Sequence, residues 1–186
     1  MSGGVDSSVA AALLKEQGYD VVGVSLKLWD YDEAERKLNG KTCCSIDDIA
    51  DAKDVCDVLG IPFYAFNHKP EFKKSVIDKF VNEYKEGRTP NPCILCNQNI
   101  KFDVLLKEAE KMGAQYLATG HYARIEHRDD GTSHLLKGVD NQKDQSYVLF
   151  HLTQAELKKI LLPVGDFNKA EIRDIAEKYG LVTAQK

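Results

Sequence analysis

Two cysteines three positions apart, Cys93 and Cys96, are the residues of this sequence whose types and spacing point most directly to chemistry. They lie in the stretch "GRTPNPCILCNQNIKFD", residues 87–103. Pro90 and Pro92 disfavour a helix at their own positions and at the residues before them. We therefore expect an extended turn that presents both thiols.

The expected surroundings of this pair favour a reactive thiolate. The apolar spacing after the turn predicts a helix that begins near Phe102, directly after the cysteines. A thiol near a helix N-terminus, beside a cation such as Arg88 or Lys101, can have a lowered pKa and react as the thiolate.

Three interpretations of the pair compete: half of a zinc site, a thioredoxin-like redox pair, or a nucleophile that handles sulfur. A structural zinc ion needs four ligands, and the further paired cysteines are the adjacent Cys43 and Cys44. A redox pair would sit in a thioredoxin-like pattern, which the neighbouring sequence does not have. The spacing alone leaves the three interpretations open.

A second chemical feature is the glycine-rich start, "MSGGVDSS", Met1–Ser8. Two glycines allow positive φ and close backbone approach, and the following residues have the spacing of a helix N-terminus. Successive N–H groups at the positive end of a helix dipole bind anions. The loop has no lysine, and the pattern GxxxxGK[ST] is absent, so a Walker-type loop is excluded. We predict a phosphate site, against the alternative of a simple helix cap.

Helices that alternate with short apolar strands position these features. Val5, Val9 and Leu13 recur every four residues and Gly18 follows as a stop signal, which predicts a first helix. Repetition of this pattern predicts an α/β fold with a parallel sheet covered by helices on both faces. The expected helices are 6–17, 47–59, 70–86, 102–112, 152–161 and 168–180; the expected strands are 20–29, 61–66 and 115–125, with a hairpin at 127–136.

Composition restricts the class of protein. The chain has 186 residues, 43% of them hydrophobic, and a formal net charge of −4, which argues against coating nucleic acid by bulk electrostatics. No apolar run approaches the roughly 18–20 residues of a membrane span, and the start lacks the pattern of a signal peptide. Five cysteines are an odd number, which disfavours a secreted disulfide framework. We expect a cytoplasmic protein without a membrane partner.

The motifs resemble a known enzyme family. "SGGVDSS" is similar to the pyrophosphate loop of N-type ATPases, which cleave ATP between its α and β phosphates. "TPNPCILCNQNIKF" closely resembles the signature of the tRNA-specific 2-thiouridylases, the bacterial MnmA family. Further matches follow in order over essentially the whole chain: "GVSLKLW", "CCSIDDIADAKDVCDVLGIPFY", "ATGHYAR", "KDQSYVLFHLTQ" and "LPVGDFNKAEIRDIAEKYGLVTAQK".

The resemblance implies roles for individual residues and a Rossmann-like fold of the adenine nucleotide alpha hydrolase type. Cys96 would be the nucleophile, and Cys93 is a second candidate, although some relatives have aspartate at its position, which argues against a catalytic role. The remaining implied residues are Met1, Ser2, Gly3, Gly4, Val5, Asp6, Ser7, Ser8, Leu26 and Gly120 for ATP, and Asn91, Pro92, Cys93, His121, Lys143, Asp144 and Gln145 for tRNA.

The implied reaction has two steps. The C2 oxygen of a flipped wobble uridine attacks the α-phosphate of ATP, and sulfur from a persulfide then displaces AMP. Mg²⁺ would offset charge on the phosphates. Cys93 and Cys96 also leave room for a [4Fe–4S] cluster, the one metal site that the resemblance suggests. The implied partners are tRNA and a sulfur-carrier or cysteine desulfurase relay protein, and the sulfur chemistry implies a disulfide bond.

The two ends of the chain carry expectations of their own. In the family a strand precedes the glycine-rich loop, and a second reactive cysteine follows the "TAQK" segment. We therefore expect a chain that lacks the first strand of its sheet, with the first helix short of packing partners, and little thiolation activity from this chain alone. We expect an ATP-binding domain over residues 1–160 and the start of a second domain over residues 161–186.

Overall fold

The computed structural model describes residues 1–28 and 46–186. Trp29, the last residue of the first expected strand, and the adjacent Cys43 and Cys44 lie outside the described residues. The chain divides into two compact units, of which the first combines Met1–Lys69 with Lys169–Lys186 and the second is Pro70–Asn168. The boundary that we expected at residue 161 stays a prediction.

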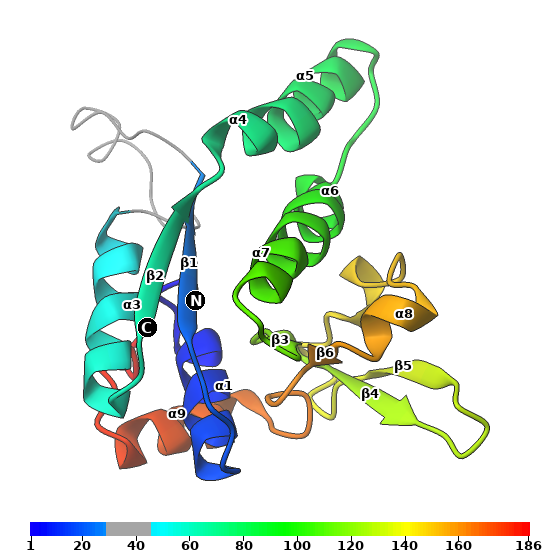
Figure 1. Ribbon diagram of the computed structural model, residues 1–186. Helices are drawn as coiled ribbons and strands as arrows, with labels where there is room; N and C mark the ends of the chain where they lie inside the picture. The colour runs from blue at the N-terminus through cyan, green and yellow to red at the C-terminus, as the bar shows by residue number, and fades with distance from the viewer. Residues whose placement is uncertain (29–45) are drawn as a thin grey trace. The chain divides into compact units, whose positions relative to one another are not determined.

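The first unit is built on a parallel strand pair. Strand β1 (Gly23–Lys27) pairs with β2 (Phe63–Asn67), with Gly23 opposite Phe63 and Lys27 opposite Asn67. Helix α3 (Ile46–Leu59) connects the two strands and packs against β1, as a crossover helix must in a parallel pair (Figure 1). The predicted α/β fold is confirmed here.

Helix α1 (Val5–Glu16) is well packed, against our expectation. Eight of its twelve residues are buried, because α9 (Lys169–Lys178) and α3 both lie against it (Figure 1). Met1 lies beside β1, where its amino group donates to the Val24 carbonyl and its own carbonyl accepts from Ser25 Oγ at 2.7 Å. The C-terminal segment of the chain thus supplies the packing surface that the sequence reasoning did not foresee.

Two long helical stretches begin the second unit. The first is continuous through α4 (Lys69–Phe72), the π-helical turn η1 (Lys73–Ile77) and α5 (Asp78–Lys85), as predicted apart from the π turn. The second consists of α6 (Pro92–Cys96), the π-helical η2 (Asn97–Val104) and α7 (Leu105–Lys111).

The predicted start of the second helical stretch was wrong. We expected a helix from Phe102, but the helical backbone begins ten residues earlier at Pro92. Proline is favourable at the first helical position, where its missing N–H would have no partner in any case. The cysteines therefore lie within the first turns of this stretch and not before it.

Four strands complete the second unit. The predicted hairpin is confirmed as β4 (Ala123–His127) paired antiparallel with β5 (Ser133–Lys137). Residues 115–125, expected as one strand, contain the short β3 (Leu117–Ala118) and the beginning of β4. Strand β3 pairs in parallel with β6 (Ile160–Leu161), which lies where we predicted helix. The remaining elements are the 3₁₀ turn η3 (Ser146–Val148) and α8 (Gln154–Leu157).

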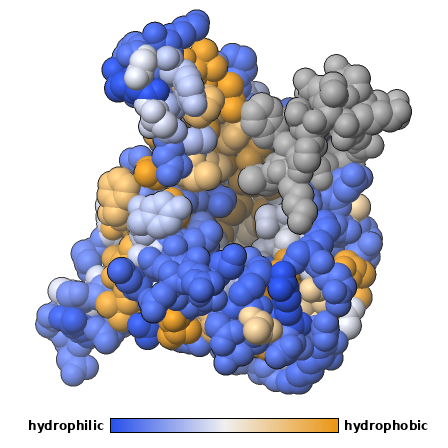
Figure 2. All heavy atoms as spheres, turned by 180° about the vertical axis from the view of Figure 1, so that it is seen from behind, coloured by the Kyte–Doolittle hydropathy of each residue, from blue (hydrophilic) through white to orange (hydrophobic). Residues whose placement is uncertain are grey.

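The core of the second unit joins the cysteine-bearing helix to these strands. Phe102, Leu149 and Ile160 are at most 1% exposed and belong to one apolar cluster with side chains from β3 and β4. Much of the surface drawn in Figure 2 is hydrophilic, as expected for a chain with 29% charged residues. Within residues 1–28 and 46–186, no helix combines the length and the apolar character needed to cross a membrane.

Candidate functional site

The glycine-rich loop leads directly into the N-terminus of α1. Gly3 has a φ of +68°, and a Cβ there would lie 2.4 Å from the backbone Cα of Asp48. Gly4 is the N-cap of α1 and has no side chain that could cap the first N–H groups. Ser2 N donates to Ser7 Oγ at 3.2 Å, and Ser7 Oγ donates to the Gly4 carbonyl at 3.1 Å, which closes the loop. A closed loop with uncapped N–H groups at a helix N-terminus fits an anion.

The other residues of the first unit that were predicted to bind ATP are mostly buried. Met1 lies beside β1, Val5 is buried in the first turn of α1, and Ser8 is buried with its Oγ donating to the Gly4 carbonyl at 2.9 Å. Leu26 is also buried, at 7% exposure, within β1. Gly120, the remaining predicted nucleotide residue, follows β3 in the second unit.

Two lysines from the C-terminal segment reach acids around the loop. Lys169 Nζ lies 2.6 Å from Asp6 Oδ1, in the first turn of α1. Lys186 Nζ lies 3.2 Å from Asp48 Oδ1 and is also paired with Asp51. The hydrogen bond with Asp51 raises the pKa of Lys186. Sequence reasoning missed both lysines, because no local spacing links residues that lie more than 130 positions apart.

The cysteine segment is fixed by a helix cap. Asn91 is the N-cap of α6, and its Oδ1 accepts from the backbone N–H of Cys93 at 3.0 Å. Pro92 occupies the first turn. Cys93 is exposed and Cys96 is partly buried. Three of the residues implied for base recognition therefore form one capped turn that ends at Cys96.

The residue after Cys96 anchors this turn to the core. Asn97 is 2% exposed, and its Nδ2 donates to the Val148 carbonyl at 3.3 Å. The backbone changes from α to π at this residue, where η2 begins. π-Helical turns occur frequently at functional sites. Asn97 carries no signal in the sequence alone, because only the fold brings it to Val148.

The cations expected to activate the thiols have other partners. The Nη2 atom of Arg88 lies 2.8 Å from Glu83 Oε1, and the guanidinium also pairs with Glu86. The charge of Lys101 helps to lower the pKa of the buried His121. The structure thus gives no support to the expectation that Arg88 activates a cysteine.

The donor set near the cysteines does not match a [4Fe–4S] cluster. Such a cluster is held by four cysteine thiolates. Cys93 and Cys96 provide two thiols, and the described part of the chain contains no group of three or more His, Cys, Asp or Glu side chains suited to a metal. Cys56, Cys93 and Cys96 are not joined in disulfides.

In the triplet Lys143–Asp144–Gln145, which was predicted to bind tRNA, the lysine is exposed, whereas the acid and the amide are partly buried. Asp144 Oδ2 accepts from Ser146 Oγ at 2.9 Å, and Gln145 Oε1 accepts from the backbone N–H of Tyr122 at 3.0 Å. Burial acts to raise the pKa of Asp144, but hydrogen bonds to its carboxylate outweigh this and lower it. Lys143 is exposed. The acid and the amide therefore hold the turn, and the lysine faces solvent.

His121, implied to face tRNA, lies in the interior. It is 7% exposed, its Nδ1 lies 2.8 Å from Thr119 Oγ1, and its ring centroid is 5.9 Å from that of Phe102. The ring centroid of His151 lies 6.1 Å from that of Phe102, and neither ring nitrogen of His151 has a hydrogen-bond partner among the described residues. Burial lowers the pKa of His121 to about 3, with further lowering by Lys101 and His151.

This burial predicts a dependence of stability on pH. Between pH 6.5 and about 3, the unfolded chain binds a proton at His121 that the folded chain does not. The free energy of unfolding should therefore fall as the pH falls through this window, by up to about 1.4 kcal/mol per pH unit from this group. His121→Asn should flatten that slope in urea titrations between pH 4.5 and 7.5. The exposed His127, replaced in the same way, serves as the control, and an unchanged slope in His121→Asn would contradict the assignment.

Comparison with known proteins decides the family. The family model described as "tRNA methyl transferase HUP domain" matches residues 1–186. The chain belongs to this HUP-domain family. The HUP-domain chain is also 55% identical over its whole length to the tRNA-specific 2-thiouridylase MnmA of Geobacter metallireducens, and 57% identical to that of Geotalea uraniireducens. The resemblance to the 2-thiouridylase family is thus confirmed.

The HUP-domain chain spans about half the length of these curated relatives, 51% and 50% respectively. Among solved structures, NMN synthetase from Francisella tularensis matches the whole chain and 62% of its own length, with a TM-score of 0.52 and 18% identity. A predicted subunit of tRNA methyltransferase from Methanocaldococcus jannaschii matches 95% of the chain and 72% of its own, with a TM-score of 0.51 and 19% identity. At these identities the two structures support the Rossmann-like fold and nothing more.

Proposed function

We propose that this chain carries out the nucleotide and sulfur chemistry of ATP-dependent 2-thiolation of the wobble uridine in tRNA. The observation that carries the proposal is the identity of 55% and 57%, over the whole chain, to enzymes named tRNA-specific 2-thiouridylase. The matched range covers both candidate sites, the closed glycine-rich loop and the capped cysteine turn. A tRNA substrate implies action in the cytoplasm.

The glycine-rich loop is proposed to bind the phosphates of ATP. Its backbone N–H groups at the start of α1 would hold them, and the ammonium group of Lys169, 2.6 Å from Asp6, adds positive charge beside the loop. Mg²⁺, when bound with ATP, would offset phosphate charge. Asp6 and Asp48 are the carboxylates next to the loop, and carboxylate oxygens are ligands that Mg²⁺ accepts together with phosphates and water.

The capped turn is proposed to meet the target base. Asn91, Pro92 and Cys93 form its exposed side, and Cys96 is the proposed nucleophile. The C2 oxygen of the flipped uridine attacks the α-phosphate and pyrophosphate leaves, which converts a poor leaving group into AMP. The outer sulfur of a persulfide on Cys96 then attacks C2 and AMP departs with the former carbonyl oxygen. A second thiol cleaves the remaining S–S bond, so that sulfur stays on the base and a disulfide forms.

Two further components belong to this proposal. The persulfide sulfur comes from a relay protein that can hand over sulfane sulfur to a thiolate. We keep the thiolate route because the sulfur step needs one thiolate on this chain, which Cys96 provides, whereas a four-iron cluster would need more ligands than the described residues bring together.

The bond of ATP that is cleaved tests the nucleotide half of the proposal. The chain is incubated with ATP labelled in the α-phosphate, with and without tRNA that carries a wobble uridine, and the products are separated. We expect tRNA-dependent formation of AMP and pyrophosphate. Production of ADP and inorganic phosphate instead, or cleavage that ignores tRNA, would contradict adenylation of the base.

A further inference from the structure

Two aromatic side chains stand out on the surface of the second unit. Tyr147 is 63% exposed and Phe150 is 69% exposed, whereas Val148 and Leu149 between them are 5% and 0% exposed. They are the most exposed large hydrophobic side chains in the described part of the protein. Tyr147 lies in the 3₁₀ turn η3, and Phe150 follows two residues after the end of that turn. Val148 and Leu149 are therefore part of the core, whereas the rings of Tyr147 and Phe150 are exposed to solvent.

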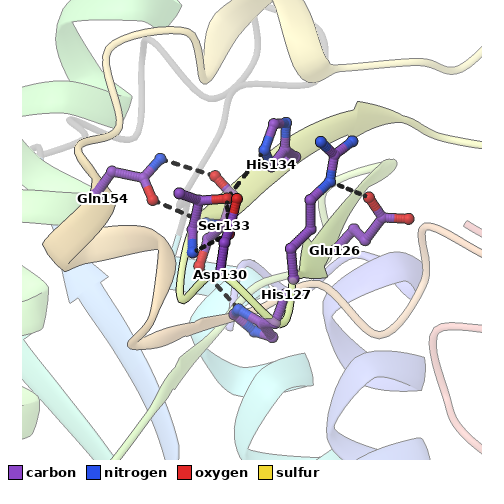
Figure 3. A network of polar contacts seen from close by, with 8 residues as sticks. Glu126, His127, Asp130, Ser133, His134 and Gln154 are labelled. Carbon is purple, nitrogen blue, oxygen red and sulfur yellow. Dashed lines mark hydrogen bonds and ion pairs between the residues drawn. The ribbon is translucent and has the colours of Figure 1, made fainter.

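The segment that carries the two rings is held at both ends. At its start, Asp144 and Gln145 bind backbone and side-chain groups of their own unit. At its end, Gln154 makes two hydrogen bonds of 2.8 Å to Ser133 in the hairpin, one to its N–H and one to its carbonyl (Figure 3). A surface that is fixed before binding loses less conformational entropy when a partner arrives.

The ring of Phe150 also has a fixed neighbour. His151 packs against it edge to face, with ring centroids 6.0 Å apart and an interplanar angle of 84°. Lys143, at the start of the same segment, is exposed and can contact a phosphate.

We infer that Tyr147 and Phe150 form a stacking platform for unpaired bases of the tRNA anticodon loop, next to the uridine that is modified. The inference rests on the proposed function. Extrusion of the target uridine leaves its neighbours unstacked, and an aromatic ring replaces the lost stacking whatever the base. With a formal net charge of −4, the chain must gain much of its RNA affinity from local contacts, and stacking is such a contact.

The size of the surface favours a base over a protein partner. Two aromatic side chains bury about 150–250 Å² each, whereas a stable protein interface buries about 800 Å² per partner. The neighbours of the rings in the chain, Lys143 and Thr153 among them, are exposed and polar. These polar residues limit the apolar surface to an area smaller than a stable protein interface needs.

Binding of an anticodon stem-loop RNA tests the platform. The 186-residue chain is titrated with a stem-loop that contains the wobble uridine, and ATP binding is measured in parallel. Tyr147→Ala and Phe150→Ala should each weaken RNA binding by roughly 5- to 150-fold, which is the effect of about 1–3 kcal/mol for one stacked base. ATP binding should not change. Tyr147→Phe and Phe150→Tyr keep an aromatic face and should retain RNA affinity, whereas Tyr147→Leu and Phe150→Leu should not.

The matched control and the contrary outcomes separate this inference from the proposed function. Tyr84→Ala removes another exposed ring, 58% exposed on α5, and should leave RNA binding unchanged. If the chain binds RNA and the double variant with both Tyr147→Ala and Phe150→Ala binds RNA equally well, the platform is refuted and the proposed function stands. If the leucine variants bind as well as the aromatic ones, stacking is refuted. If the unaltered chain binds ATP but no RNA, the proposed function fails and the platform with it.

Discussion

Gly3→Ala is expected to destabilise the first unit and to remove ATP binding. A left-handed backbone costs a residue with a Cβ roughly 1–2 kcal/mol, and Gly3 has a φ of +68°. The new Cβ would also lie 2.4 Å from both the Cα and the carbonyl oxygen of Asp48, at the start of α3. Backbone atoms cannot rotate away as a flexible side chain can, so the loop or α3 must shift. Either shift breaks the closed conformation that orients the N–H groups of the loop.

Two other glycines separate the sources of this effect. Gly18 has a φ of +86° but open space around its Cα, so Gly18→Ala carries the backbone strain without the clash. Gly4 has a φ of −97°, and a Cβ there would meet Ser2 Oγ at 3.6 Å, an ordinary contact. In urea unfolding, Gly3→Ala should be clearly less stable than Gly18→Ala and Gly4→Ala. Calorimetric titration should show that Gly18→Ala still binds ATP. Equal stability of Gly3→Ala and Gly18→Ala would show that the contact with Asp48 is unimportant.

Local patterns in the sequence predicted most of the helices, the hairpin and the crossover strand pair. The early start of the helical stretch at Pro92 was missed because proline was taken as a helix breaker, although it also favours the first turn after a cap such as Asn91. Strand β6 was missed because two residues, Ile160 and Leu161, are too short to show a period. Their assignment depends on pairing with β3, which no local pattern contains.

The same limit applies to the candidate site. The loop and the cysteine turn are continuous in sequence, so their residues could be named before the structure. Lys169 could not, because its partner Asp6 lies at the other end of the chain. The motif "KDQ" was visible, but motif matching does not tell that Asp144 and Gln145 bind their own unit while Lys143 faces solvent. Burial of His121 likewise depends on its packing against Phe102.

Cys96→Ser is expected to abolish formation of 2-thiouridine and to preserve tRNA-dependent release of pyrophosphate. A serine hydroxyl cannot carry a persulfide, so the sulfur step loses its nucleophile, and thiolation should fall at least about a thousandfold. The substitution replaces one atom by a slightly smaller one in a partly buried position. The helical stretch keeps its cap at Asn91 and its anchor at Asn97, so the turn should stay in place.

The assay for Cys96 needs a system in which thiolation is measurable. Residues 1–186 replace the corresponding half of the Geobacter metallireducens relative, which is 55% identical over this range, and the chimera is supplied with ATP, tRNA and a persulfide donor. Cys93→Ser in the same chimera is the matched control, since Cys93 lies one turn earlier and is exposed. It should retain most thiolation, because in the proposed reaction the persulfide is on Cys96 and the second thiol is expected after the TAQK segment, in the half of the chimera that the relative supplies. Normal thiolation by Cys96→Ser, or equal loss in both variants, would contradict the role of Cys96, and loss of pyrophosphate release in Cys96→Ser would mean that the turn also positions the base for adenylation.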